Sequence, residues 1–100
     1  MSRHHIQLIR AIFHDPPPHN LHWRDVEALL RHVGATVEPI SGARVRVTLG
    51  RVEDVLHRPH GDEVDRPSVL HVRAVLGRAG VTPAAYEHTG EKPASGSPAG

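Results

Sequence analysis

The chain has 100 residues, of which 38% are hydrophobic and 3% aromatic, and its formal net charge is +1 at pH 7. This length fits one domain with a modest core and argues against a large ligand cavity. The absence of cysteine excludes a disulfide scaffold and most structural zinc sites. No apolar run reaches transmembrane length, and the charged N-terminus does not fit a signal peptide, so we expect a cytoplasmic protein with no membrane partner.

The basic residues are almost all arginine, because eleven arginines accompany the single lysine, Lys92. The planar fork of arginine can bind phosphate through two parallel hydrogen bonds. The same bias arises from a GC-rich genome, and a net charge near zero does not by itself indicate a nucleic-acid partner. A phosphate-binding role is therefore left open by the composition.

Two helices are expected in the first third of the chain. The apolar residues of segment 4–15 (HHIQLIRAIFHD) suit a short helix, which the following prolines end. Segment 22–34 carries apolar residues at i, i+3, i+4 and i+7, and Gly34 ends that helix. Trp23, at the start of this second helix, is expected in the core.

A third long helix is expected over residues 65–80 (DRPSVLHVRAVLGRAG). Asp65 or Arg66 caps it, Pro67 fits its first turn, and Gly80 closes it. Thr82 is expected to cap one further helical turn. The histidine within this helix, His71, is expected at the surface, as are the histidines near the other helix ends.

The valine-rich segment between the helices predicts three short antiparallel strands near residues 36–39, 44–49 and 53–58. Apolar and polar residues alternate in the middle strand, RVRVTL. The alternation directs three side chains towards the core, Val45, Val47 and Leu49, and three outward, Arg44, Arg46 and Thr48.

The order helix, helix, three strands, helix predicts an α+β fold. We expect a three-stranded antiparallel sheet with helices on one face and its other face exposed. A single domain is expected over residues 1–86. Residues 87–100, largely Gly, Pro, Ser and Ala, are expected to form a disordered tail.

Four segments occur in a characteristic order: WRDVEALLRHVGATVE, SGARVRVTL, RPHG and SVLHVRAVLGRAGVTP. In this order and spacing they resemble HicA, the small toxin family of type II toxin–antitoxin systems. The resemblance covers about residues 21–86 and leaves the first helix outside as an N-terminal addition. It implies a fold like that of a double-stranded-RNA-binding domain, with the order α-β-β-β-α.

The resemblance also implies a function. HicA-like proteins are mRNA interferases that bind and cut RNA without a metal or other cofactor, and a HicB antitoxin neutralises them. We therefore expect RNA and a HicB-like antitoxin as partners. RNA would lie across the exposed sheet face and contact Arg44, Arg46 and Arg58, mainly through its phosphates.

One position departs from the family pattern. The family places its catalytic histidine directly after Gly-Ser at the start of the second strand, where this chain has Gly42-Ala43-Arg44. Arginine can hold phosphate, but it stays protonated and is a poor general base. The best remaining bases are His57 and His60, which can also be read as ordinary residues at a strand end.

Three functions follow from these observations. The first is a HicA-like RNA-binding toxin, which, if active, is a metal-independent endoribonuclease with weakened or relocated catalysis. The second is a non-catalytic interaction module that kept the HicA fold. The third is a small metal-binding protein that uses His57, His60, Asp62 and Asp65.

Overall fold

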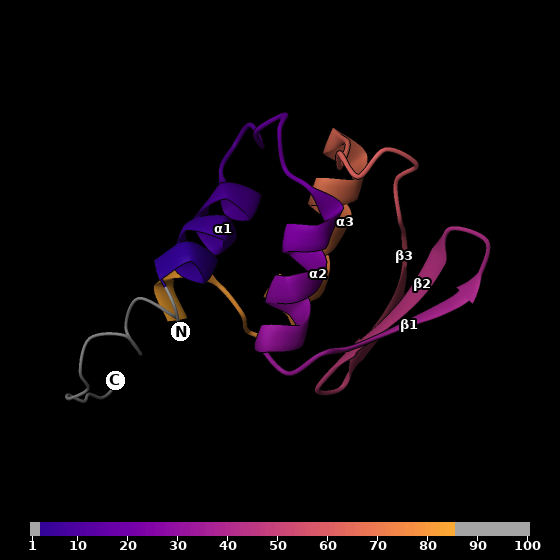
Figure 1. Cartoon of the computed structure of the whole chain (residues 1–100). Coiled ribbons are helices and arrows are strands. Elements are labelled where there is room, and N and C mark those ends of the chain that lie inside the picture. Colours follow the sequence, from indigo (N-terminus) through magenta and orange to yellow (C-terminus); the bar gives the residue numbers. More distant parts are fainter. Residues whose placement is uncertain (1–2, 86–100) are drawn as a thin grey trace.

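A computed structural model of the chain describes residues 3–85 (Figure 1). The elements in chain order are α1 (Arg3–Phe13), α2 (Trp23–His32), β1 (Thr36–Ser41), β2 (Arg44–Leu49), β3 (Val52–His57) and α3 (Arg66–Arg78). The tail expected at residues 87–100 lies outside the described residues. None of the helices within residues 3–85 combines the length and the apolar character needed to span a membrane.

The three strands form one antiparallel sheet in the order β1-β2-β3, which confirms the predicted α+β fold. β2 has the predicted bounds, and β3 begins and ends one residue earlier than predicted. β1 runs on to Ser41, because its pairing with β2 continues through a register shift after Pro39. Gly42 has a positive φ of 55° in the two-residue turn between β1 and β2, a conformation that favours glycine.

The pairing register sorts the strand side chains as the alternation predicted. The apolar residues of β2 are buried, and its polar residues lie on the opposite face. In β3, Leu56 pairs with Val45 and Val52 pairs with Leu49, so these side chains share the buried face. Asp54 pairs with Val47 and is therefore a carboxylate on the inner face of the sheet.

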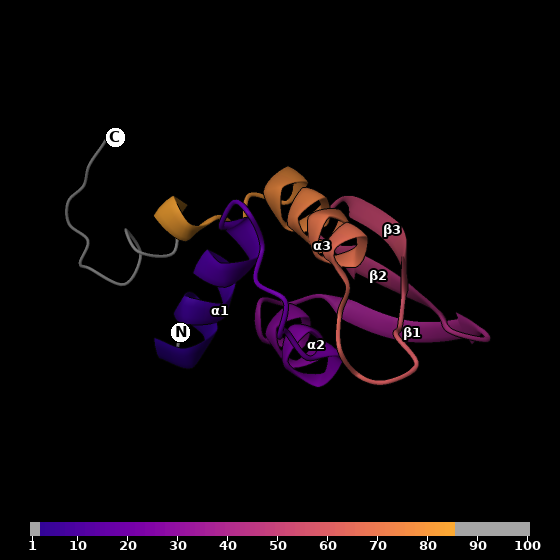
Figure 2. The ribbon, with the colours of Figure 1, turned by 90° about the horizontal axis from the view of Figure 1, so that it is seen from above.

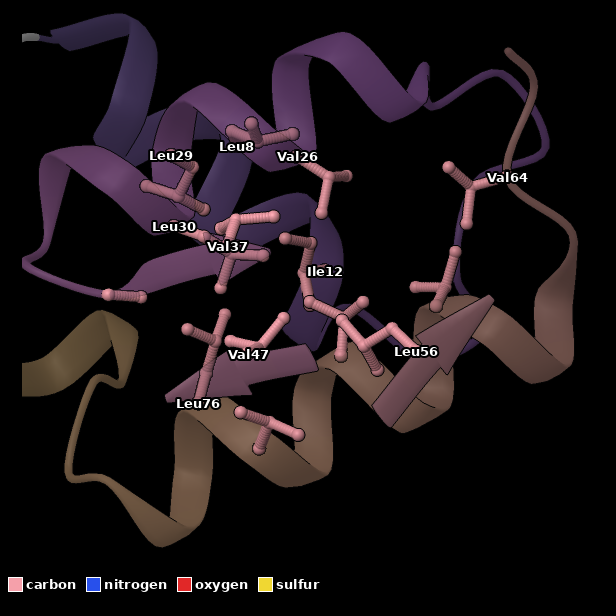
Figure 3. Close-up of a cluster of buried hydrophobic side chains, with 14 of the residues drawn as sticks. Leu8, Ile12, Val26, Leu29, Leu30, Val37, Val47, Leu56, Val64 and Leu76 are labelled. Carbon is pink, nitrogen blue, oxygen red and sulfur yellow. The ribbon is translucent and has the colours of Figure 1, made fainter. Parts of the chain in front are cut away.

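All three helices lie on the same side of the sheet (Figures 1 and 2). α2 packs on β1, α3 packs on β3, and α1 packs on the two other helices. The interior is apolar throughout, since no polar side chain within residues 3–85 is buried. Its residues come from every layer (Figure 3), among them Ile9, Ile12, Val26, Leu29, Leu30, Val37, Val47, Leu56, Val72 and Leu76.

The N-terminal addition is fixed to the rest of the domain at its C-terminal end. Arg73 of α3 donates hydrogen bonds to the carbonyl oxygens of Ile12, at 3.0 Å, and His14, at 2.7 Å. Carbonyls in the last turn of a helix have no partner within the helix, so these bonds satisfy them. The ring of His5 in α1 stacks on the ring of His32 in α2 with 4.2 Å between the ring centroids.

The start of α3 has the predicted cap. The Asp65 carboxylate accepts the backbone N–H of Ser68 at 3.0 Å, and Pro67 occupies the first turn. Hydrogen bonding by Ser68, first through its side chain and then through its backbone N–H, lowers the pKa of Asp65 because it stabilises the charged carboxylate. Thr82 caps the short turn after α3 by accepting the N–H of Ala85 at 3.2 Å, also as predicted.

The loop between β3 and α3 is attached to the start of α2 through Asp62. The Asp62 carbonyl oxygen accepts the N–H of Trp23 at 2.6 Å, and its carboxylate accepts the N–H of Arg24 at 3.1 Å. The neighbouring Val64 is buried and donates its N–H to the Leu21 carbonyl at 2.8 Å. Because His22, the N-cap residue of α2, makes no side-chain cap bond, Asp62 takes over that role from the distant loop.

We expect Asp62→Ala to lower the free energy of unfolding by about 2 kcal/mol, since it removes this cap and places alanine at a positive φ. The φ of Asp62 is 72°. Asp62→Asn keeps an acceptor and tolerates the same φ, so its loss should be less than half as large. Urea unfolding measures both, with the exposed Glu63→Ala as the control. Equal losses in the alanine and asparagine variants would contradict this role.

Candidate functional site

Arg44 and His57 lie directly opposite each other at one end of the sheet, where β2 begins and β3 ends. The next pair along is hydrogen-bonded, because the Arg58 N–H donates to the Ala43 carbonyl oxygen at 2.7 Å. Arg44 and His57 are therefore a non-hydrogen-bonded pair, in which the Cα atoms are only about 4.5 Å apart. The register thus places a guanidinium and an imidazole side by side on the exposed face.

The turn before β2 and the segment after β3 form a shallow hollow at this same end. Its volume is about 330 Å³, and its lining residues are Gly42, Ala43, Arg58, Pro59 and His60. Arg58 and His60 are exposed. We call Arg44, His57, Arg58 and His60, together with this hollow, the sheet end. Four of the five residues predicted for the site therefore come together there.

The fifth, Arg46, is placed differently. It lies in the middle of the exposed face, between Glu38 of β1 and Glu53 of β3, and forms ion pairs with both at 3.3 Å. One guanidinium between two carboxylates leaves this part of the face with a net negative charge. Such a surface repels phosphate. We therefore expect phosphate to bind Arg46 more weakly than the arginines of the sheet end.

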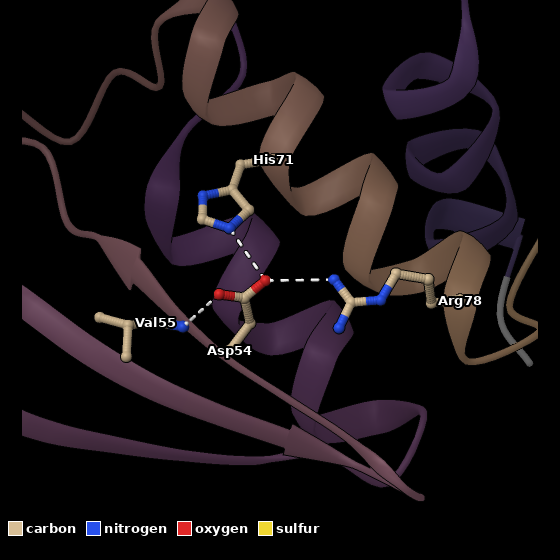
Figure 4. A network of polar contacts seen from close by, with 4 residues as sticks. All are labelled: Asp54, Val55, His71 and Arg78. Carbon is tan, nitrogen blue, oxygen red and sulfur yellow. Dashed lines mark hydrogen bonds and ion pairs between the residues drawn. The ribbon is translucent and has the colours of Figure 1, made fainter.

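A polar network joins β3 to α3 on the helix side of the sheet (Figure 4). The Asp54 carboxylate contacts the His71 Nε2 at 3.1 Å and accepts a hydrogen bond from Arg78 at 3.3 Å. Its second oxygen accepts the N–H of Val55 at 2.8 Å. Burial alone would raise the pKa of Asp54, but the bonds from Val55, His71 and Arg78 outweigh it and lower the pKa.

His71 also lines a pocket of about 170 Å³ between β3 and α3, which we call the edge pocket. The lining residues are Trp23, Leu56, His57, Pro67, Ser68, His71 and Val72. Trp23 is 5% exposed and belongs to the core, as expected. His57 is shared by the edge pocket and the sheet end.

Sequence reasoning expected His71 at the surface, and its side chain is 39% exposed, but that reasoning missed the contact with Asp54. The sequence of β3 contains the signal that could have predicted this contact. Its inward positions are Val52, Asp54 and Leu56, and a carboxylate at an inward position of a strand needs a partner from the layer above.

The residues of the metal-binding hypothesis do not converge. Asp62 is engaged at the start of α2, and Asp65 caps α3. Across residues 3–85 there is no group of three or more His, Cys, Asp or Glu side chains that could hold a metal ion. No observation therefore favours this hypothesis, and we do not carry it further.

The protein is a small α+β domain with the architecture of a double-stranded-RNA-binding domain. Residues 23–81 match the family described as the HicA toxin of bacterial toxin–antitoxin systems. Because this match covers more than half of the chain, the chain belongs to the HicA toxin family, as its sequence motifs predicted. α1 lies outside the matched residues. No curated protein and no solved structure gave a match.

We expect Asp54 to stabilise the fold near neutral pH and to lose this contribution in acid. Its pKa is lower in the folded protein than the ordinary value of 3.8, so its contribution is fully present above that value. The contribution is lost as the pH falls through the folded pKa. In Asp54→Asn, the free energy of unfolding should therefore fall less steeply between about pH 5 and pH 3 than in the wild type.

Urea unfolding at a series of pH values measures this slope. Glu63→Gln removes the same formal charge from an exposed loop position and serves as the control. A wild-type slope in Asp54→Asn would show that the contacts of Asp54 with His71 and Arg78 add nothing to stability.

Proposed function

We propose that this member of the HicA family is an RNA-binding toxin that holds RNA phosphates at the sheet end. The observation that carries the proposal is the convergence of Arg44, Arg58, His57 and His60 around the turn where the family resemblance places its catalytic residue. Arginine forks bind phosphate bidentately, and RNA helices are recognised largely through phosphates and 2′-hydroxyls.

The distribution of charge supports the sheet end over the middle of the exposed face. Neither Arg44 nor Arg58 forms an ion pair within the described part of the chain, whereas Arg46 is bound to two glutamates. A guanidinium that already has carboxylate partners must give them up to bind phosphate. The two unpaired guanidinium groups can bind phosphate without that cost.

A protein partner belongs to the same proposal. HicA toxins are part of bacterial toxin–antitoxin systems, so we infer a HicB-like antitoxin that binds this chain. An acidic surface on the antitoxin would complement Arg44 and Arg58. An antitoxin that covers the sheet end would compete directly with RNA.

We expect Arg44→Gln and Arg58→Gln each to weaken binding of a labelled RNA stem-loop about tenfold at low salt, because each removes one charge-assisted phosphate contact. Each variant should also reduce the slope of log K against log salt concentration by about 0.7 to 0.9. Fluorescence anisotropy at several salt concentrations measures both quantities. Arg46→Gln is the matched control and should bind RNA within about twofold of the wild type.

Two results would count against this interface. If the wild type shows no affinity for RNA at low salt, the proposed function fails. If Arg46→Gln loses as much affinity as Arg44→Gln, RNA lies across the middle of the exposed face instead of the sheet end.

A second candidate function is a non-catalytic interaction module, and Arg44 at the family's histidine position is the observation that favours it. This candidate predicts that the wild type does not cut RNA, and that Ala43→Ser combined with Arg44→His gains the ability to arrest growth. The catalytic version predicts that induction of the wild type arrests growth and that His57→Ala or His60→Ala relieves the arrest. Growth curves after induction distinguish the two.

A further inference from the structure

The edge pocket contains a histidine, His71, whose ring is in contact with a carboxylate. An ionised carboxylate accepts hydrogen bonds and cannot donate one, so the contact between His71 Nε2 and Asp54 places the ring proton on Nε2. In the neutral ring, Nδ1 is then unprotonated and can accept a proton. Nδ1 lies on the side of the ring away from Asp54 (Figure 4).

The edge pocket adjoins the sheet end through His57. This residue faces Arg44 across the strands and also lines the edge pocket with His71. The pocket volume of about 170 Å³ is below the roughly 300 Å³ at which ordinary small-molecule sites begin. A phosphate or part of a ribose fits this space, whereas a whole nucleotide held at the sheet end would enter it only in part.

The following inference rests on the proposed function. We propose that His71, positioned by Asp54, is the base that takes the proton from a ribose 2′-hydroxyl of RNA bound at the sheet end, and that His57 is the acid. The 2′-oxygen then forms a bond to the adjacent phosphorus, and the bond between phosphorus and the 5′-oxygen breaks. His57 gives its proton to the leaving 5′-oxygen, so one proton is taken and one is returned.

The products of this step are a 2′,3′-cyclic phosphate and a 5′-hydroxyl. Arg44 sits beside His57 and binds the phosphate oxygens, which carry the charge that develops in the transition state. Arg78 acts through Asp54, since its Nη1 donates to the same carboxylate oxygen that His71 contacts. Asp54 and Arg78 are thus positioning residues, and His71 and His57 are the catalytic residues.

The position of the pair sets it apart from the other histidine–carboxylate pair of the described residues, because His71 lines the edge pocket together with His57. The side chains of His71 and Asp54 are 39% and 28% exposed, so both remain accessible to solvent. A second pair, His22 with Asp62 at 3.3 Å, is comparable in distance, but Asp62 fastens the loop to α2 and His22 lines neither the edge pocket nor the hollow. His22 therefore provides a matched control.

The experiment uses the full chain and a labelled RNA stem-loop, and measures affinity and the single-turnover cleavage rate separately. His71→Gln should reduce the cleavage rate at least about a hundredfold and leave RNA affinity within about twofold. His22→Gln should change neither. Wild-type products should carry the cyclic phosphate, and a 2′-deoxy substitution at the cleaved nucleotide should prevent cleavage there.

The outcomes separate this inference from the function on which it rests. Absence of RNA binding by the wild type overturns the proposed function. RNA binding without cleavage, or cleavage by His71→Gln at the wild-type rate, overturns the inference and leaves the RNA-binding function standing. Loss of affinity equal to the loss of rate in His71→Gln would show that His71 only holds RNA, and it also overturns the inference.

Asp54→Asn provides a second variant that keeps the size of the side chain. It should lower the cleavage rate by at least tenfold with unchanged affinity, and it should remove the preference of His71 for the Nε2–H tautomer. Nitrogen chemical shifts of the His71 ring report that tautomer directly. A wild-type rate in a folded Asp54→Asn protein would contradict the positioning role.

Discussion

The antiparallel register of β2 and β3 assigns every side chain of these strands to one face or the other. It places Val45 and Val47 against the helices, and it places Arg44 beside His57 on the opposite face. A slip by one residue would exchange the two faces, bury the arginines and expose the valines. The burial of the valines therefore also fixes the polar arrangement at the sheet end, and the site needs no further interaction to hold its register.

Two acidic residues in the segment after β3 cap helices and do not belong to the sheet end. Asp62 supplies the missing cap of α2, Asp65 caps α3, and the buried Val64 between them anchors the loop. These contacts hold the later part of the loop against the starts of α2 and α3. His60 stays exposed at the start of this loop, close to the turn before β2. The crowding of charge in this segment is thus largely explained by helix capping.

Sequence periodicity predicted the elements because the apolar alternation of β2 and the apolar spacing of the helices reflect burial directly. It predicted the cap at Asp65 because that bond spans only three residues. The contact between Asp54 and His71 spans 17 residues, and Asp62 reaches Arg24 across 38. Such contacts depend on how α3 and the loop lie on the sheet, which no local pattern specifies. The two glutamates around Arg46 could have been found by aligning the predicted strands.

In the proposed site, the exposed face binds the phosphate, and the base comes from the helix that packs on the edge strand β3. The two glutamates that pair with Arg46 make the middle of the face unfavourable for phosphate, and we therefore propose the sheet end as the place of phosphate contact. Arginine at the start of β2 is a permanent cation, so in this chain that position can hold an anion but cannot take a proton. β3 is an edge strand, and α3 packs directly on it, so His71 of α3 contacts β3 at Asp54 from the helix side and lines the edge pocket with His57. In the proposed site, the phosphate therefore stays beside β2 while the base approaches the 2′-hydroxyl from α3.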